Sequence, residues 1–142
     1  MSNFEVEVSN RIASFPESKN LCRSASDFLL ESIPSMYSYN FTCLGRPIIQ
    51  YPQDIVAMQE LVWTVKPDLI IETGIAHGGS LILSASMLAL LDMCDAIEAG
   101  EKLDPKISKR MVLGVDIDIR NHNRAAIEAH PMMSRIQMIQ GS

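Results

Sequence analysis

The sequence has few cysteines, no excess of positive charge and no internal repeat or low-complexity tract. Its three cysteines show no CxxC spacing and no clustering with the three histidines, so neither a zinc site nor a disulfide framework is indicated. We expect Cys22, Cys43 and Cys94 to be buried thiols in a reducing compartment. A formal net charge of -5 argues against a nucleic-acid-binding surface, so no nucleic-acid partner is predicted.

Signals for export and membrane insertion are also weak. Residues 1–20 contain Glu5, Glu7 and Glu17 and lack the long apolar core of a signal peptide. The longest apolar run, near residues 81–91, is interrupted by serines and ends at Asp92, which makes it too short and polar to span a bilayer. We therefore expect a cytoplasmic protein without a membrane span.

The chain has 142 residues, of which 47% are hydrophobic, enough to build a core. Residues 1–50 are predicted to be helical and then irregular, with an amphipathic helix over residues 18–33. The aromatic, turn-rich stretch 35–53 predicts a loop or a short hairpin. Asp54 is expected to cap a helix over residues 55–65, in which Trp63 is assigned to the core.

From residue 51 onward the pattern predicts the first half of a Rossmann-like α/β domain, residues 51–142. Short apolar runs, expected to be strands covered on both faces, are "DLIIETG", "MVLGVDID" and "RIQMIQGS". Between them lie helical patterns from Gly79 to Leu91 and over "NHNRAAIEAHP", and an exposed connector with a helical start over residues 92–110. This alternation predicts a parallel sheet with ligands bound beyond the carboxyl ends of its strands.

The stretch "ETGIAHGGS" lies at such a strand end. Gly74 stands where the strand must turn, and a residue without Cβ permits a positive φ. Gly78 and Gly79 are expected to let a ligand approach the backbone at the start of the next helix, whose N–H groups favour an anion. Ser80 can cap that helix or contact the ligand, and Glu72 can accept from the ligand or orient the turn. The competing interpretation is that the glycines serve packing alone.

The dinucleotide pattern GxGxxG is absent, because Ala76 occupies the place of the second glycine. A smaller anionic group, such as an amino-acid carboxylate, therefore fits better than a pyrophosphate. Asp116, at the end of the second strand, is placed to grip a ribose, although it follows Gly74 by more than the usual roughly 20 positions. An acid after each strand with glycines between them suggests S-adenosylmethionine.

Several nearby polar residues have a structural as well as a functional interpretation. Asp118 is expected to cap the following helix or to meet Arg120 rather than to bind ligand. His77 is a weak candidate for a ligand contact or a catalytic base. We expect His122 and His130 to be structural.

Three separated segments, "LGRPIIQYPQD", "KPDLIIETGIAHGGS" and "VLGVDIDIRNHNR" followed by "IEAHPM", resemble the cephalosporin hydroxylase family. The resemblance runs from about Tyr39 to Ser142. That family is built on the S-adenosylmethionine-dependent methyltransferase fold and includes sugar O-methyltransferases. The resemblance implies a small-molecule or sugar acceptor.

The resemblance also implies which residues surround the cofactor. The turn would hold the methionine part, and the end of the second strand would hold the adenosine. The residues implied are Glu72, Gly74, Ile75, Ala76, Gly78, Ser80, Asp116 and Ile117. A less direct transfer places the loop around Gln50 and Tyr51 near the site.

Two departures from the family pattern stand out. Cys43 occupies a position where the family leads us to expect tryptophan, which puts an aromatic contact from this loop in doubt. Family members also continue past "MIQGS", and their acidic metal motif lies in that later part, so any Mg²⁺ would be bound by residues outside this sequence. We expect a fragment, a natural truncation or one part of an assembly. The first strand would then keep an exposed apolar edge, which favours a homo-oligomer.

The predicted function is transfer of a methyl group from S-adenosylmethionine to a hydroxyl group, with this chain carrying the cofactor half and little or no catalysis. Two alternatives remain open. One is an oxygen-dependent hydroxylase, although no HxD or HxE pair for iron appears. The other is a non-catalytic assembly subunit of the same fold.

Overall fold

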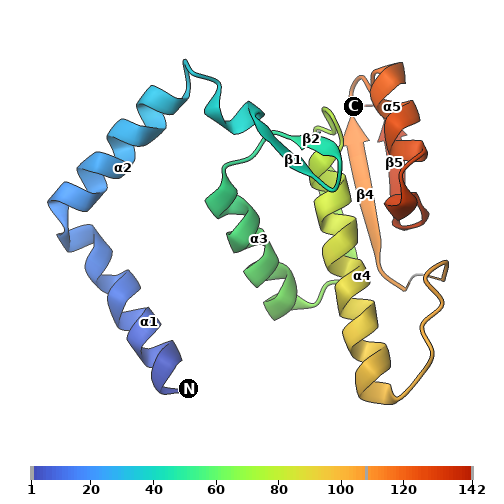
Figure 1. Cartoon of the computed structure of the whole chain (residues 1–142), viewed down its shortest axis with the longest axis horizontal. Coiled ribbons are helices and arrows are strands. Elements are labelled where there is room, and N and C mark those ends of the chain that lie inside the picture. The colour runs from blue at the N-terminus through green and yellow to red at the C-terminus, as the bar shows by residue number, and fades with distance from the viewer. Residues whose placement is uncertain (1, 108, 142) are drawn as a thin grey trace. The chain divides into compact units, whose positions relative to one another are not determined.

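A computed structural model of the chain describes residues 2–107 and 109–141 (Figure 1). The chain divides into two compact units, Met1–Tyr37 and Ser38–Ser142. The first unit contains α1 (Asn3–Ser14), a short 3-10 helix η1 (Phe15–Glu17) and α2 (Lys19–Ser32). Ser2 and Glu5 form a capping box that starts α1. Within this unit, the rings of Phe28 and Tyr37 pack edge to face with centroids 5.4 Å apart.

The second unit begins with an antiparallel hairpin, which follows the 3-10 turn η2 (Tyr37–Tyr39). Its strands are β1 (Phe41–Cys43) and β2 (Arg46–Ile48). The two residues of the connecting loop, Leu44 and Gly45, have φ values of 45° and 86°. Positive φ at both positions of a two-residue loop gives it a twist that matches the twist of the flanking strands. The turn-rich stretch is therefore a hairpin, one of the two structures predicted for it.

Helix α3 (Pro52–Val65) starts earlier than predicted. Tyr51 is its N-cap residue, and Asp54 lies within the first turn, where its carboxylate faces the positive end of the helix dipole. The assignment of Trp63 to the core was wrong, because its side chain is 51% exposed and Val62 is the residue that this helix buries. The ammonium group of Lys66 lies 5.1 Å from the centroid of the Trp63 ring.

Three parallel strands form the sheet, in the order β3 (Leu69–Thr73), β4 (Met111–Asp116) and β5 (Ile136–Gln140). Helix α4 (Gly79–Ala99) connects β3 to β4, and α5 (Asn121–Glu128) with the 3-10 helix η3 (Pro131–Arg135) connects β4 to β5. This confirms the predicted α/β architecture. It also confirms the helical start of the connector, since α4 continues to Ala99 and ends at Gly100 in a left-handed conformation.

One face of the sheet carries the core. Val112 and Ile136 belong to one buried cluster with Leu81 and Leu88 of α4 and Ile127 of α5, all nearly inaccessible to solvent. Figure 1 shows α4 running alongside β4. By length and composition alone α4 is apolar enough to cross a membrane, a test that a buried core helix also passes. Its buried residues supply much of this core.

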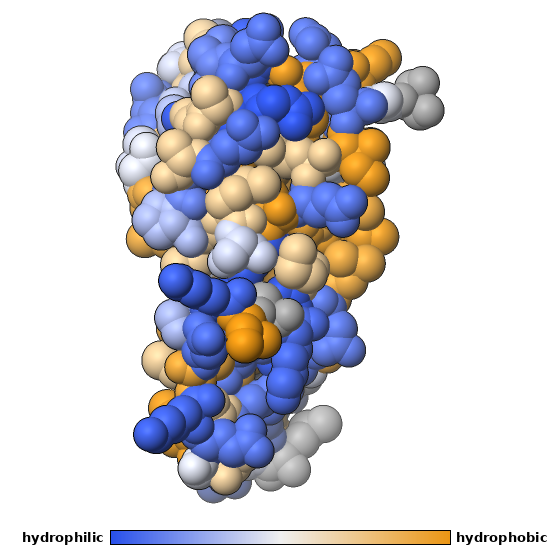
Figure 2. Space-filling model, turned by 90° about the vertical axis from the view of Figure 1, so that its right-hand side faces the viewer, coloured by the Kyte–Doolittle hydropathy of each residue, from blue (hydrophilic) through white to orange (hydrophobic). Residues whose placement is uncertain are grey.

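The opposite face of the sheet differs from the prediction of strands covered on both faces. Within residues 2–107 and 109–141, this face has no helix packed over it comparable to α4. Leu69, Ile71 and Ile139 are exposed by 49%, 62% and 44%. The register places Leu113 beside Ile71 and Val115 beside Ile139 on the same face. We call this the bare face. In the view of Figure 2, hydrophobic side chains are densest along the upper right margin, and hydrophilic ones are spread over the rest of the surface with scattered hydrophobic ones among them.

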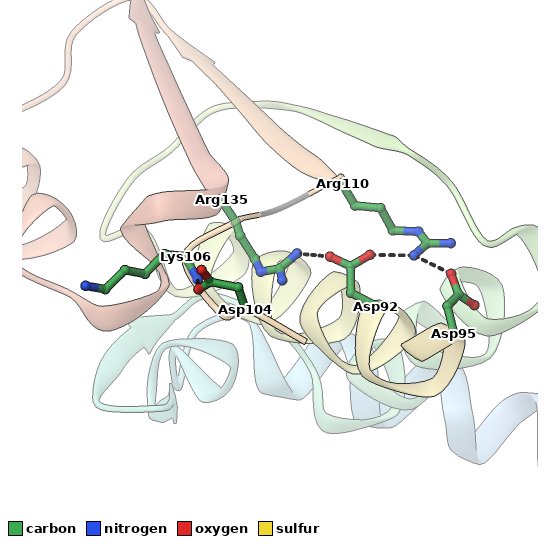
Figure 3. Close-up of polar contacts among 6 residues, drawn as sticks. All are labelled: Asp92, Asp95, Asp104, Lys106, Arg110 and Arg135. Atoms are coloured by element: carbon green, nitrogen blue, oxygen red, sulfur yellow. Dashed lines mark hydrogen bonds and ion pairs between the residues drawn. The ribbon is translucent and has the colours of Figure 1, made fainter. Parts of the chain in front are cut away.

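A cluster of buried charges lies at the amino ends of the strands (Figure 3). Asp92 of α4 accepts a hydrogen bond of 2.5 Å from Arg110, which precedes β4, and another from Arg135, which precedes β5. Arg110 also meets Asp95 at 2.8 Å. Burial by itself raises the pKa of Asp92, but the hydrogen bonds from Arg135 and Arg110 outweigh it, so this pKa is lowered. The cluster ties α4 to the beginnings of both strands.

The prediction of buried thiols was wrong. Cys22 is exposed, and Cys43 and Cys94 are half-buried. Partial burial raises the pKa of Cys43, so its thiol stays protonated at neutral pH.

Candidate functional site

The turn between β3 and α4, residues 74–78, lies at the carboxyl ends of the strands, as predicted. Its φ angles are positive at Gly74 (84°), Ala76 (46°) and Gly78 (82°). Ala76 is the unusual member, because a residue with Cβ in this region costs about 1–2 kcal/mol. Contacts from several elements must therefore hold the turn in place.

Asp116 stabilises the turn through its carboxylate, which binds backbone N–H groups. Its Oδ2 accepts hydrogen bonds from the backbone N–H of Ile75 (2.6 Å) and of Ala76 (3.4 Å). Its Oδ1 accepts from the N–H of Asp118 at 3.0 Å. The bonds from Asp118 and Ile75 lower the pKa of the Asp116 carboxyl, so it is ionised at neutral pH. In the structure Asp116 thus organises the turn, a role that the sequence suggested for Glu72 and not for this residue.

The glycines of the turn have different roles. A Cβ at Gly78 would lie 2.4 Å from Ile127, and one at Gly79 would lie 2.2 Å from the carbonyl oxygen of Pro47. These two glycines allow α5 and the hairpin to approach the start of α4, which supports the packing interpretation. A Cβ at Gly74 would meet no described atom within 4 Å. Gly74 is therefore the position that is open toward a ligand.

Two residues that were not singled out from the sequence bind the carbonyl groups of the turn. Arg46 of β2 donates to the carbonyl oxygen of His77, and Asn123 of α5 donates to that of Ala76. Both lie in segments that resemble the family, but their residue types alone did not indicate a contact with the turn. The signal that could have drawn attention to Arg46 was its place within the "LGRPI" stretch.

Two cavities flank the turn. The first, of about 360 Å³, lies between the turn and α3; it is lined by apolar residues such as Met58 and Leu61 together with Glu72, Asp54 and Gln50. The second, of about 510 Å³, lies over the end of β4; its polar lining comes from Asp116, Asp118, Arg120, Asn123 and Tyr39. Gly74, Ala76 and His77 line both. An elongated ligand can thus lie across the turn with a different chemical group in each cavity.

Glu72 and Ser80 meet in the first cavity, where the serine hydroxyl donates to the carboxylate. Burial raises the pKa of Glu72, although the bond from Ser80 opposes this. A carboxylate whose pKa is raised by folding costs stability once it is ionised. Such a cost is typical of a functional position.

This cost gives a prediction for the Glu72→Gln variant. Glutamine keeps an acceptor for Ser80 without the charge, so we expect a higher urea midpoint of unfolding than wild type at pH 7. The advantage should shrink as the pH falls toward about 4 and disappear below about 3, where the glutamate is protonated in both states. Equal midpoints for the two proteins at pH 7 would contradict this account of Glu72.

The remaining predicted residues are placed as follows. Asp118 is exposed and lines the second cavity; the expected cap is not formed, because Arg120 is the N-cap residue of α5. Ile117 is 75% exposed and lines neither cavity. His130 contributes to structure, since its ring bonds the carbonyl oxygen of Leu44 at 3.0 Å.

Across the described ranges 2–107 and 109–141, no group of three or more histidine, cysteine, aspartate or glutamate residues is arranged to hold a metal ion. Asp116 binds backbone N–H groups and Glu72 binds Ser80.

A parallel sheet with a glycine turn between its first strand and helix, and an acid at the end of the next strand, defines a Rossmann-like domain. A more specific assignment comes from family comparison. The model of the family described as Rhamnosyl O-methyltransferase/CmcI matches residues 35–142. The chain belongs to this family, which confirms the resemblance found in its motifs.

Among solved structures, one titled "cmcI-N160 SAH" is similar to this chain, with 19% sequence identity and a TM-score of 0.48. The similarity covers 72% of this chain and 43% of that one. The chain thus spans less than half the length of that structure. Among curated proteins no match is found.

Proposed function

We propose that this chain binds S-adenosylmethionine across the glycine turn and belongs to an O-methyltransferase whose acceptor is a small molecule or a sugar. The observation that carries the proposal is the pair of cavities that share the turn, one partly apolar with carboxylates and one polar. Membership of a family described by O-methyl transfer supports it.

The residues present fit such a cofactor. The start of α4 lacks a side-chain cap, and the first N–H groups of a helix favour a carboxylate. Glu72 and Asp54 supply negative charge to the first cavity, which suits a sulfonium and an ammonium group. Asp116 and Asp118 supply acceptors for ribose hydroxyls in the second. Gly74 leaves room for the backbone of the turn to be approached closely.

When bound, S-adenosylmethionine supplies an electrophilic methyl group, which an acceptor oxygen takes while the sulfur retains the electrons of the broken C–S bond. The turn and its supports fix the position of the cofactor site, and such positioning lowers the barrier. The acceptor hydroxyl must also lose its proton. His77 lines both cavities and is our candidate for that base.

Calorimetric titration of the chain with S-adenosylhomocysteine, and with NAD as control, tests the proposal. We expect micromolar binding of the first and none of the second, because the turn lacks the second glycine that approaches a pyrophosphate. A folded chain that binds neither compound would refute the proposal for this chain.

A comparison of two acids separates support of the turn from direct contact with the nucleoside. Asp116→Ala should weaken binding of S-adenosylhomocysteine at least tenfold, since it removes charged hydrogen bonds worth roughly 1.5–3 kcal/mol. Asp118→Asn leaves the turn intact and tests direct contact in the second cavity. Titrations of both variants should show a loss for Asp116→Ala; unchanged affinity would remove Asp116 from the site.

A further inference from the structure

We infer that Arg46 and Asn123 are positioning residues that set the conformation of the glycine turn for ligand binding. This inference deepens the proposed function and rests on it for the binding measurement. Neither residue belongs to the turn, to β3 or to α4. They come from β2 and α5, elements far apart in the sequence that meet at the turn.

The contacts form a closed set. Arg46 approaches the carbonyl oxygen of His77 with two nitrogens, Nε at 3.0 Å and Nη2 at 2.6 Å. Asn123 donates from Nδ2 to the carbonyl oxygen of Ala76 at 2.8 Å. Its Oδ1 accepts from Nη2 of Arg46 at 3.3 Å, which links the two side chains. Asn123 is only 3% exposed, so its position is fixed by packing.

These contacts act on the strained part of the turn. Asp116 accepts hydrogen bonds from the N–H groups of Ile75 and Ala76. Asn123 donates to the carbonyl oxygen of Ala76, and Arg46 donates to that of His77. Ala76 is thus held on both sides in a conformation that costs free energy. With the two carbonyl oxygens turned toward a cation and an amide, the partial negative charge of the turn is neutralised on that side.

The polarity of the turn is relevant to an anionic group. A carboxylate at the start of α4 is favoured by N–H groups and disfavoured by carbonyl oxygens. If the peptide between Ala76 and His77 rotated, its carbonyl oxygen would no longer face the Asn123 amide. Arg46 and Asn123 therefore preserve the orientation that an amino-acid carboxylate requires, without touching that carboxylate.

The Arg46→Lys variant separates positioning from bulk charge. Lysine keeps the positive charge but lacks the planar fork that engages two acceptors at once. We expect about tenfold weaker binding of S-adenosylhomocysteine by calorimetry, from the loss of charge-assisted hydrogen bonds. In ¹H–¹⁵N spectra of the free chain, the amide signals of Ala76, His77 and Gly78 should shift, while that of Val112 in the core should not.

Arg124→Lys is the matched control. Arg124 lies on α5 beside Asn123, is partly exposed, and pairs with Glu128 at 3.7 Å within the helix. It should leave both affinity and turn signals unchanged. Equal behaviour of the two variants would overturn the inference. So would faster hydrogen exchange at Val112 in Arg46→Lys, because the loss of affinity would then come from a destabilised core and not from the turn. If wild type does not bind S-adenosylhomocysteine, the proposed function fails, and the amide signals alone then decide the role of Arg46.

Discussion

Replacing Asp92 with asparagine is expected to lower the free energy of unfolding by about 3–5 kcal/mol, the cost of breaking a buried ion pair from one side. Asp92 faces Arg110 and Arg135, and the side chains of these three residues are 5%, 10% and 3% exposed. Asparagine removes the carboxylate that pairs with both guanidinium groups. Because natural domains are stable by about 5–15 kcal/mol, urea titration should show a large loss or an unfolded chain.

The Asp95→Asn variant is the control for this prediction, and the pH dependence of stability is a second test. Asp95 also meets Arg110, but its side chain is 45% exposed, so Asp95→Asn should cost less than about 1 kcal/mol. The pKa of Asp92 is lowered by folding, so its contribution is present above about pH 4 and is lost as the pH falls further. The gap between wild type and Asp92→Asn should therefore narrow in acid. A gap that does not change with pH would show that the charge of Asp92 is not what stabilises the cluster.

Gly79→Ala is expected to cost about 3 kcal/mol, the upper end for an overpacked core. The new Cβ would lie 2.2 Å from the carbonyl oxygen of Pro47 and 2.7 Å from Cβ of Ile48. A backbone oxygen cannot rotate away, so the β1–β2 hairpin must move. Because Arg46 belongs to that hairpin, binding of S-adenosylhomocysteine should weaken as well. Urea titration and calorimetry measure the two effects.

Gly100→Ala separates crowding from backbone strain. Gly100 ends α4 with φ of 67°, and a Cβ there meets no described atom within 4 Å. Its substitution should cost about 1–2 kcal/mol through strain alone. Faster hydrogen exchange in the hairpin is expected for Gly79→Ala and not for Gly100→Ala. Similar exchange in both variants would mean that the hairpin does not rest on Gly79.

Much of the second unit could be predicted from local pattern. Continuous apolar runs identified β3, β4 and β5, and the change between strand and helix periods gave the parallel order. Burial was predicted less well. An apolar run indicates that a strand can be covered on both faces, but the bare face, with Ile71 62% exposed, depends on which other elements pack there. The prediction that Trp63 is buried failed for the same reason. Periodicity identifies an apolar stripe on a helix but not the element that packs against it.

The site was predicted where it depends on the chain near the turn. Gly74 has the expected positive φ and Asp116 lies at the expected strand end. The partners of each group were not predictable. Gly79 is explained by Pro47 and Gly78 by Ile127, residues that become neighbours only in the folded chain. Arg46 and Asn123 are 77 positions apart, in two of the segments that resemble the family, and only the fold reveals that they meet at one turn.

The bare face has a consequence for the heat capacity of unfolding. Apolar surface that water already reaches in the folded state is not newly exposed when the chain unfolds. The increase in heat capacity should therefore fall below the usual value of about 12–15 cal/mol/K per residue, and the urea m-value should be low for a chain of this length. Leu69, Ile71 and Ile139 contribute to this deficit. A molecule that covers them would raise both quantities together, so calorimetry can register coverage of the bare face whatever covers it.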